Sequence, residues 1–197
     1  MENLDTRQKI LQAAVDLISE KGYHDVSVRE ICARAGVTKP VLYYYFKDKE
    51  DVLAELIQEG NRRFHHLIDK HILPDSPFIK QLEGLFEVYI RYTEENFSHI
   101  AIAINVELSP LPERIKTLSR EKTIEVTERI LPVFQQGVKE GVFSPSDDLK
   151  MLAVSFTSPL SVFILQSVLH HDPIARMKED LTGYFQFWKK RFLREKV

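Results

Sequence analysis

The sequence contains one cysteine, one tryptophan and only seven glycines among its 197 residues. A single cysteine excludes a disulfide within the chain and is typical of proteins from a reducing compartment. So few glycines leave little room for a glycine-rich phosphate-binding loop. The 27 basic residues nearly balance the 29 acidic ones. This balance argues against a protein that coats nucleic acid through a uniformly basic surface.

Segments typical of membranes and metal sites are also missing. Residues 1–17 lack the uninterrupted apolar stretch of a signal peptide. The most apolar stretch, residues 153–169, contains several serines, which favours a helix buried in an interface over a membrane span. The seven histidines form no pair with the H-x-x-x-H or H-E-x-x-H spacing. We therefore expect a soluble, cytoplasmic protein with no membrane association, metal, cofactor or enzymatic activity.

Helical periodicity runs through the whole chain, and no alternating strand pattern persists. The sequence therefore predicts an all-α fold. Prolines and short polar residues at positions 74–77 mark the clearest linker. The predicted helices cover residues 5–21, 27–35, 39–46, 48–68, 78–96, 100–108, 113–139 and 148–170, and a last one ends near residue 194.

The segment from residue 27 to residue 53 has the signals of two short helices joined by a tight turn. Ser27 and Glu30 form the capping box S-x-x-E. Gly36 stands where the end of a helix requires a positive φ. Thr38 is placed to cap the next helix, which has a proline in its first turn. This pattern predicts a helix-turn-helix, whose second helix enters the major groove of DNA.

The second of these helices contains three consecutive tyrosines at positions 43–45. Successive helical residues point about 100° apart, so the three rings cannot all enter one core. If Leu42 and Phe46 are buried, Tyr43 and Tyr44 point partly outward. Their hydroxyl groups are then free to donate to phosphate oxygens of DNA.

The run T-K-P-V-L-Y-Y-Y-F-K-D-K-E-D-V-L at 38–53, preceded by E-I-C-A-R-A-G-V at 30–37, resembles the DNA-binding signature of the tetracycline-repressor (TetR) family. The resemblance is strong over about residues 5–57, and the remainder matches only in length and helical pattern. Position 40 is commonly glycine in the family but is Pro40 here, so no backbone N–H at this position can contact DNA. Position 32 is commonly alanine, and Cys32 should pack equivalently.

The resemblance implies a ligand-responsive transcriptional repressor that binds a palindromic operator on double-stranded DNA as a homodimer. Residues 1–47 would form a three-helix DNA-binding unit. Residues 48–197 would form a helical-bundle domain for effector binding and dimerisation. A small, hydrophobic effector would shift DNA affinity through the fourth helix, which begins at residue 48.

Three sets of residues carry these predictions: the DNA contacts, the effector contacts and the dimer interface. The phosphate contacts would be Ser27, Tyr43, Tyr44, Tyr45 and Lys49, and the residues near base edges would be Thr38, Lys39 and Val41. The effector contacts would be Phe86, Tyr89, Thr93, Asn105, Phe134, Phe156 and Gln166. The dimer interface on the last two helices would be Phe156, Leu160, Phe163, Ile164, Tyr184 and Trp188.

Two other functions remain open from the sequence. One is an all-α adaptor whose aromatic helix binds a protein partner, with negligible DNA affinity even at low salt. The other is a small-molecule-binding or hydrolytic helical domain with a vestigial DNA unit. Such a domain would show ligand affinity or turnover that is not coupled to DNA.

Overall fold

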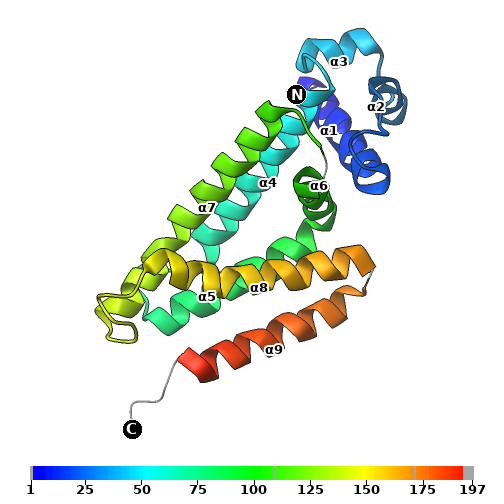
Figure 1. Ribbon diagram of the computed structural model, residues 1–197. Helices are drawn as coiled ribbons and strands as arrows, with labels where there is room; N and C mark the ends of the chain where they lie inside the picture. The colour runs from blue at the N-terminus through cyan, green and yellow to red at the C-terminus, as the bar shows by residue number, and fades with distance from the viewer. Residues whose placement is uncertain (1, 109, 171, 193–197) are drawn as a thin grey trace. The chain divides into compact units, whose positions relative to one another are not determined.

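This computed structural model describes residues 2–108, 110–170 and 172–192, without the side chains of residues 2–5, 105–108 and 192. Every described element is a helix (Figure 1), which confirms the all-α prediction. The helices are α1 (Glu2–Lys21), α2 (Val28–Ala35), α3 (Lys39–Tyr45), α4 (Lys49–His71), α5 (Phe78–Glu95), α6 (Phe97–Leu108), α7 (Glu113–Lys139), α8 (Leu149–His170) and α9 (Ile174–Phe192).

The chain divides into two compact units, and neither follows the predicted boundary at residue 47. Unit 1 comprises Met1–Arg62 and Asn96–Lys122, and unit 2 comprises Arg63–Glu95 and Thr123–Val197. Helices α4 and α7 therefore each contribute residues to both units. The expected three-helix unit is larger because the first part of α4, all of α6 and the start of α7 belong to it.

Unit 1 has a continuous apolar core. Helix α1 contributes a buried apolar stripe to it, in which Ile10 and Ile18 are inaccessible to solvent. Three residues from the second segment, Ile102, Leu111 and Ile115, are buried in the same core. Three short helices expose more apolar surface than they can cover for each other, and this segment covers the remainder. The core of unit 1 is thus completed by residues far away in the sequence.

Unit 2 has an aromatic core that spans four helices and a loop. Phe78 and Phe143 contact each other edge to face, with ring centroids 5.2 Å apart. Phe156 and Trp188 do the same at 5.2 Å. Edge-to-face geometry is favourable for aromatic pairs and adds to the effect of burial. Phe86 of α5 stacks on Phe185 of α9 at 4.4 Å.

Four of the six residues predicted at the dimer interface are buried within a single chain. Phe156, Leu160, Ile164 and Trp188 are at most 7% exposed within a single chain. They therefore have little surface left to contribute to an interface with a second copy. The broad apolar stripes of the last two helices include both a core face and an exposed face, and the sequence did not separate them. Phe163 and Tyr184 are only partly buried.

The outward face of α8 carries apolar and small polar side chains. Met151, Val154, Val162 and Leu169 are between 38% and 63% exposed. No residue from position 151 to position 169 is charged. By length and composition alone α8 could also span a membrane, since its mean hydropathy reaches 1.7. Phe187 adds a 64% exposed ring on neighbouring α9.

One glycine allows α5 to pass close to the end of α4. A Cβ atom at Gly84 would lie 2.1 Å from the carbonyl oxygen of His71. Such an approach is impossible for any other residue unless the backbone moves. The position of α5 in unit 2 is therefore fixed against the last turn of α4. At the start of α5, the N–H of Phe78 donates to Glu140, which directly follows α7, at 2.8 Å.

Candidate DNA-binding surface

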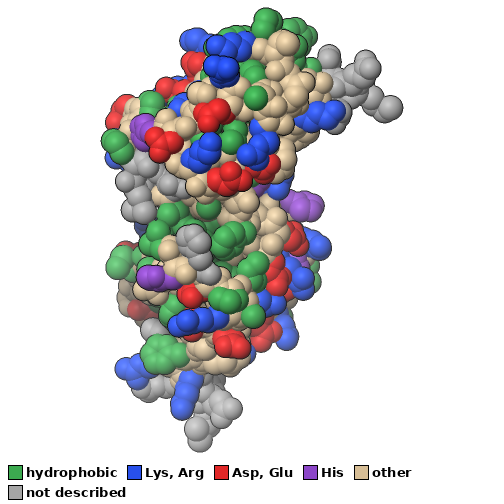
Figure 2. Space-filling model, turned by 90° about the vertical axis from the view of Figure 1, so that its right-hand side faces the viewer, with side chains coloured by type: hydrophobic (Ala, Val, Ile, Leu, Met, Phe, Trp, Pro, Cys, Tyr) green, Lys and Arg blue, Asp and Glu red, His purple; other side chains and the backbone are tan. Residues whose placement is uncertain are grey.

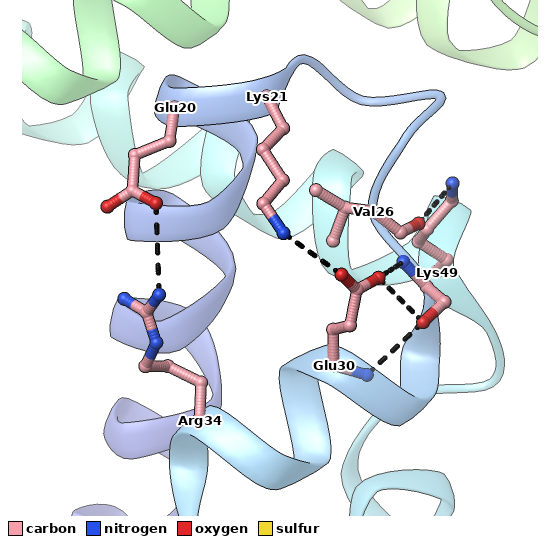
Figure 3. Close-up of polar contacts among 7 residues, drawn as sticks. Glu20, Lys21, Val26, Glu30, Arg34 and Lys49 are labelled. Atoms are coloured by element: carbon pink, nitrogen blue, oxygen red, sulfur yellow. Dashed lines mark hydrogen bonds and ion pairs between the residues drawn. The ribbon is translucent and has the colours of Figure 1, made fainter.

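The capping box predicted at the start of α2 is present. Ser27 Oγ accepts the N–H of Glu30 at 3.2 Å, and Glu30 Oε2 accepts the N–H of Ser27 at 2.9 Å. The same carboxylate accepts the Ser27 hydroxyl at 2.8 Å and pairs with Lys21 at 3.1 Å (Figure 3). These bonds, first of all those from Ser27, lower the pKa of Glu30 to about 2. The box fixes where α2 begins.

The turn after α2 also follows the prediction. Gly36 has φ 66° and ψ 33°, the left-handed conformation that favours glycine. The N–H of Val37 donates to the carbonyl oxygen of Cys32 at 3.0 Å, and the N–H of Gly36 donates to that of Ala33 at 3.4 Å. These bonds satisfy carbonyls that the end of α2 would leave without a partner.

Helix α3 is held by two buried residues. Leu42 is inaccessible to solvent, and Phe46, which ends the helix, is 3% exposed. Thr38 stands at the N-cap with extended backbone angles, but its side chain makes no capping hydrogen bond. The predicted side-chain cap at Thr38 is therefore wrong. Pro40 lies in the first turn as expected, where a missing N–H costs no hydrogen bond within the helix.

The outward face of α3 is aromatic and apolar, with a single cation at its start. Tyr44 is 75% exposed, Tyr43 is 51% exposed and Val41 is 36% exposed. Lys39 is exposed in the first turn. Tyr45 is partly buried against the core of unit 1, and its ring contacts Tyr44 edge to face at 5.0 Å. Tyr43 and Tyr44 thus present their phenol groups to solvent.

Two predicted phosphate contacts are used inside the protein instead. The ammonium of Lys49 donates to the carbonyl oxygens of Val26 at 2.7 Å and Tyr23 at 2.8 Å. Burial lowers the pKa of Lys49, while Asp25 and Glu30 oppose that change. The Ser27 hydroxyl is likewise occupied by Glu30. Both residues hold the loop between α1 and α2, so they shape the surface rather than supply its phosphate donors.

The predicted DNA contacts leave out two exposed cations of unit 1. Arg29 lies exposed in the first turn of α2, and Lys47 lies exposed directly after α3. The signal for Arg29 was its place two residues after the N-cap Ser27, where the first turn of a helix presents free N–H groups. Lys47 follows the buried Phe46, so its side chain has no core to enter.

The charges around the surface are mixed. Arg34 of α2 lies 3.8 Å from Glu20 of α1 (Figure 3) and 3.9 Å from Asp16 of the same helix. On the face of the molecule in Figure 2, acidic and basic side chains are interspersed, without a broad patch of one sign. Any attraction for DNA must come from a few local cations and hydroxyl groups. This agrees with the near-neutral composition.

The structure places most of the predicted effector residues in unit 2, at different degrees of burial. Tyr89, Phe86, Thr93, Phe134 and Phe156 all belong to unit 2, where Thr93, Phe134 and Phe156 are fully buried. Burial raises the pKa of Tyr89 to about 12. Gln166 is exposed on α8, so its prediction as an interior residue is wrong. The side chain of Asn105 lies outside the described residues.

Helix α4 also contributes an aromatic side chain, Phe64, to the interior of unit 2. Its ring contacts Tyr89 at 5.5 Å and Tyr92 at 5.1 Å, both edge to face. Burial also raises the pKa of Tyr92 to about 12. Among the residues that the structure describes, no group of histidine, cysteine, aspartate and glutamate could hold a metal ion.

Comparison with known proteins identifies the family. The model for bacterial regulatory proteins of the tetR family matches residues 10–56, which span the helix-turn-helix. The fatty acid metabolism regulator protein of Bacillus subtilis is 41% identical over 140 residues, covering 69% of this chain and 68% of that protein. The chain belongs to the tetR family. It is a ligand-responsive, DNA-binding transcriptional regulator, as the resemblance predicted.

Solved structures show the same fold for this TetR-family regulator. A Syntrophomonas wolfei protein assigned to the family has a TM-score of 0.81 at 23% identity, covering 99% of this chain and 98% of that one. FadR from Bacillus subtilis in complex with stearoyl-CoA has a TM-score of 0.76 at 21% identity, covering 89% and 95%. Both structures are described as those of transcriptional regulators.

Proposed function

We propose that this regulator binds a palindromic operator as a homodimer, in the cytoplasm, and that a long-chain acyl-CoA lowers its affinity for that operator. The observation that carries the DNA part is the orientation of α3. Leu42 and Phe46 lock one side of the helix into the core, and this leaves Tyr43 and Tyr44 exposed on the other. A rigid helix with outward donors is what reading a major groove requires.

The proposed contacts are sorted by their chemistry. Tyr43 and Tyr44 donate to phosphates and set the register of the protein on the duplex, with Lys47 and Arg29 adding charge. Thr38, Lys39 and Val41 lie at the start of α3 and approach base edges. Lysine can donate to guanine, and valine can contact a thymine methyl group. Tyr45 is half-buried, packs its ring against that of Tyr44 and would donate its hydroxyl to a phosphate.

The proposed dimer uses the outward face of α8 together with Phe187 of α9. A helix face that is apolar and uncharged over residues 151–169 is expected to be covered in a soluble protein. A second copy is the partner that supplies an equal face under two-fold symmetry. Two recognition helices about 34–36 Å apart would then read successive major grooves. The prediction of a homodimer stays, with a different set of interface residues.

The proposed effector suits the interior of unit 2. Its described core is built from aromatic and aliphatic side chains, and its fully buried polar residues are Gln81, Thr93 and Ser167. An acyl chain fits such surroundings by hydrophobic burial. The 41% identical relative is named as a regulator of fatty acid metabolism, and one structural neighbour is a complex with stearoyl-CoA. Helix α4 would transmit binding, since it carries Phe64 in unit 2 and follows α3 in unit 1.

The test is a titration of operator binding with three ligands. Fluorescence anisotropy of a labelled operator duplex is measured with stearoyl-CoA, free CoA and stearate. We expect stearoyl-CoA to raise the operator Kd by about 5- to 150-fold, the usual range of allosteric coupling. Free CoA should do nothing. An operator Kd that stearoyl-CoA leaves unchanged would rule out this effector class. Absence of operator binding would rule out the proposed function itself.

A further inference from the structure

Arg114, in the first turn of α7, reaches the first turn of α4 within unit 1. Its Nη2 atom lies 3.2 Å from Asp51 Oδ1, and its Nη1 atom lies 3.6 Å from Glu50 Oε1. The neighbouring Ile115 is completely buried in the core of unit 1. The start of α7 is thus anchored, and the guanidinium extends from a fixed base.

Asp51 uses its two carboxylate oxygens for different partners. Oδ1 accepts from Arg114, while Oδ2 accepts the backbone N–H of Lys47 at 3.2 Å. Lys47 directly follows Phe46, the residue that ends α3. The N–H of Asp51 itself donates to Asp48 Oδ1 at 2.7 Å, so the capped first turn of α4 holds this carboxylate in place. One residue therefore joins the start of α7 to the exit of the recognition helix.

The other contacts at the exit of α3 come from the helices beside it. Arg7 of α1 lies over the Phe46 ring, 5.4 Å from its centroid, and pairs with Glu55 of α4 at 2.9 Å. This cation–π contact and this ion pair hold the end of α3 to α1 and α4, and neither involves α7. Helix α7 differs from α1 because it continues into unit 2 as residues 123–139. In unit 2 it pairs with α4 again, through Arg129 and Asp69.

We propose that Arg114 is a positioning residue for operator binding, which holds the turn after α3 through Asp51 and so carries the position of α7 to the recognition helix. The inference rests on the proposed function, because it concerns operator affinity. Arg114 acts without touching DNA. A second route for coupling then exists beside the continuous helix α4, and it depends on one ion pair.

The experiment compares four variants of the full chain: Arg114→Gln, Asp51→Ala, the double variant and Arg120→Gln. Arg120 is the matched control, since it lies on the same helix and in the same unit but its ion pair among the described residues is with Glu113, at 3.9 Å, with both side chains more than 70% exposed. Operator Kd is measured by anisotropy, Tm by calorimetry, and amide exchange over residues 46–51 by mass spectrometry.

Arg114→Gln should raise the operator Kd by about 2- to 30-fold, the range for residues that alter coupling from outside a binding site. Amide exchange over residues 46–51 should rise by about two- to fivefold, as expected for loss of an exposed ion pair. Tm should change little. In the Asp51→Ala background, Arg114→Gln should add almost nothing, because contacting residues in one chain of interactions are not additive.

Two results would overturn the proposal. One is an operator Kd for Arg114→Gln equal to that of Arg120→Gln. The other is an equal loss with and without Asp51, which would show that Arg114 acts only by general charge. If the wild-type protein binds no operator, the proposed function fails instead. The amide-exchange measurement alone then decides whether Arg114 holds this turn. Unchanged exchange over residues 46–51 in Arg114→Gln would contradict the inference.

Discussion

The ammonium of Lys49 lies 4.1 Å from the centroid of the Tyr23 ring and donates to the carbonyl oxygen of the same residue. Lys49 is the first residue of α4, which follows the recognition helix α3 along the chain. Tyr23 lies in the loop between α1 and α2. A cation over an aromatic face and a charge-assisted hydrogen bond act together here. Lys49 lies within the segment matched by the family model, and it has a structural role there.

Replacing Lys49 and Lys47 should separate structural from electrostatic effects. Lys49→Met leaves the carbonyls of Tyr23 and Val26 without this donor, so we expect the free energy of unfolding to fall by about 1–3 kcal/mol. Lys47→Met should leave stability unchanged and reduce the salt dependence of DNA binding by about one charge per protomer. Urea unfolding and salt titrations of DNA affinity measure the two effects. The opposite pattern would return Lys49 to the phosphate contacts.

Substitutions on α3 should distinguish phosphate contacts from base contacts. Tyr44→Phe removes only a hydroxyl group, and we expect it to weaken binding to all duplexes alike, by about 0.5–1.5 kcal/mol per contact. Lys39→Ala should weaken binding and also change the preferred sequence. Binding to a panel of operators with single base changes measures both. A uniform loss for both variants would contradict the role given to Lys39.

The capping box should make stability depend on pH in acid. The pKa of Glu30 is about 2 in the folded chain, below its ordinary value of 4.5. The stabilisation by this carboxylate is therefore complete above pH 4.5 and is lost as the pH falls towards 2. Glu30→Gln should have a lower Tm than wild type at pH 6, and the difference should shrink between pH 4.5 and pH 2. A difference that stays constant across this range would show that the charge plays no part.

The outward face of α8 should control the oligomeric state. Val162 is 49% exposed in one chain, and Val162→Asp would place a charge at the proposed interface. We expect this variant to shift the protein to monomers in analytical ultracentrifugation and to weaken operator binding. Ile124→Asp is the control, because Ile124 is 57% exposed on α7. If Val162→Asp stays as dimeric as the control, the interface lies elsewhere.

Local signals in the sequence predicted the helix-turn-helix well. The Ser27–Glu30 box, the left-handed Gly36 and the buried Leu42 each depend on neighbours within a few residues, so spacing alone specifies them. Thr38 shows the limit of such reasoning. Its position at the N-cap was right, but the rotamer that makes a hydrogen bond is chosen by surroundings that the sequence does not reveal.

Long-range packing could not be predicted in the same way. Ile102 and Ile115 complete the core of unit 1, but nothing near them in sequence links them to α1. Trp188 and Phe156 were expected in a dimer interface because apolar periodicity does not tell a core face from an exposed one. The inward Lys49 was missed for a related reason, since its acceptors are backbone carbonyls, which every residue carries.

Selection of bound sites from a random duplex library, at near-physiological salt, tests the central claim most directly. A dimer that reads DNA through α3 should enrich a palindrome with two half-sites whose centres lie about one helical turn, or a multiple of it, apart. Enrichment should disappear for Val162→Asp at the same protein concentration. Recovery of no motif, with binding that vanishes as salt rises, would leave only nonspecific affinity and would contradict the account.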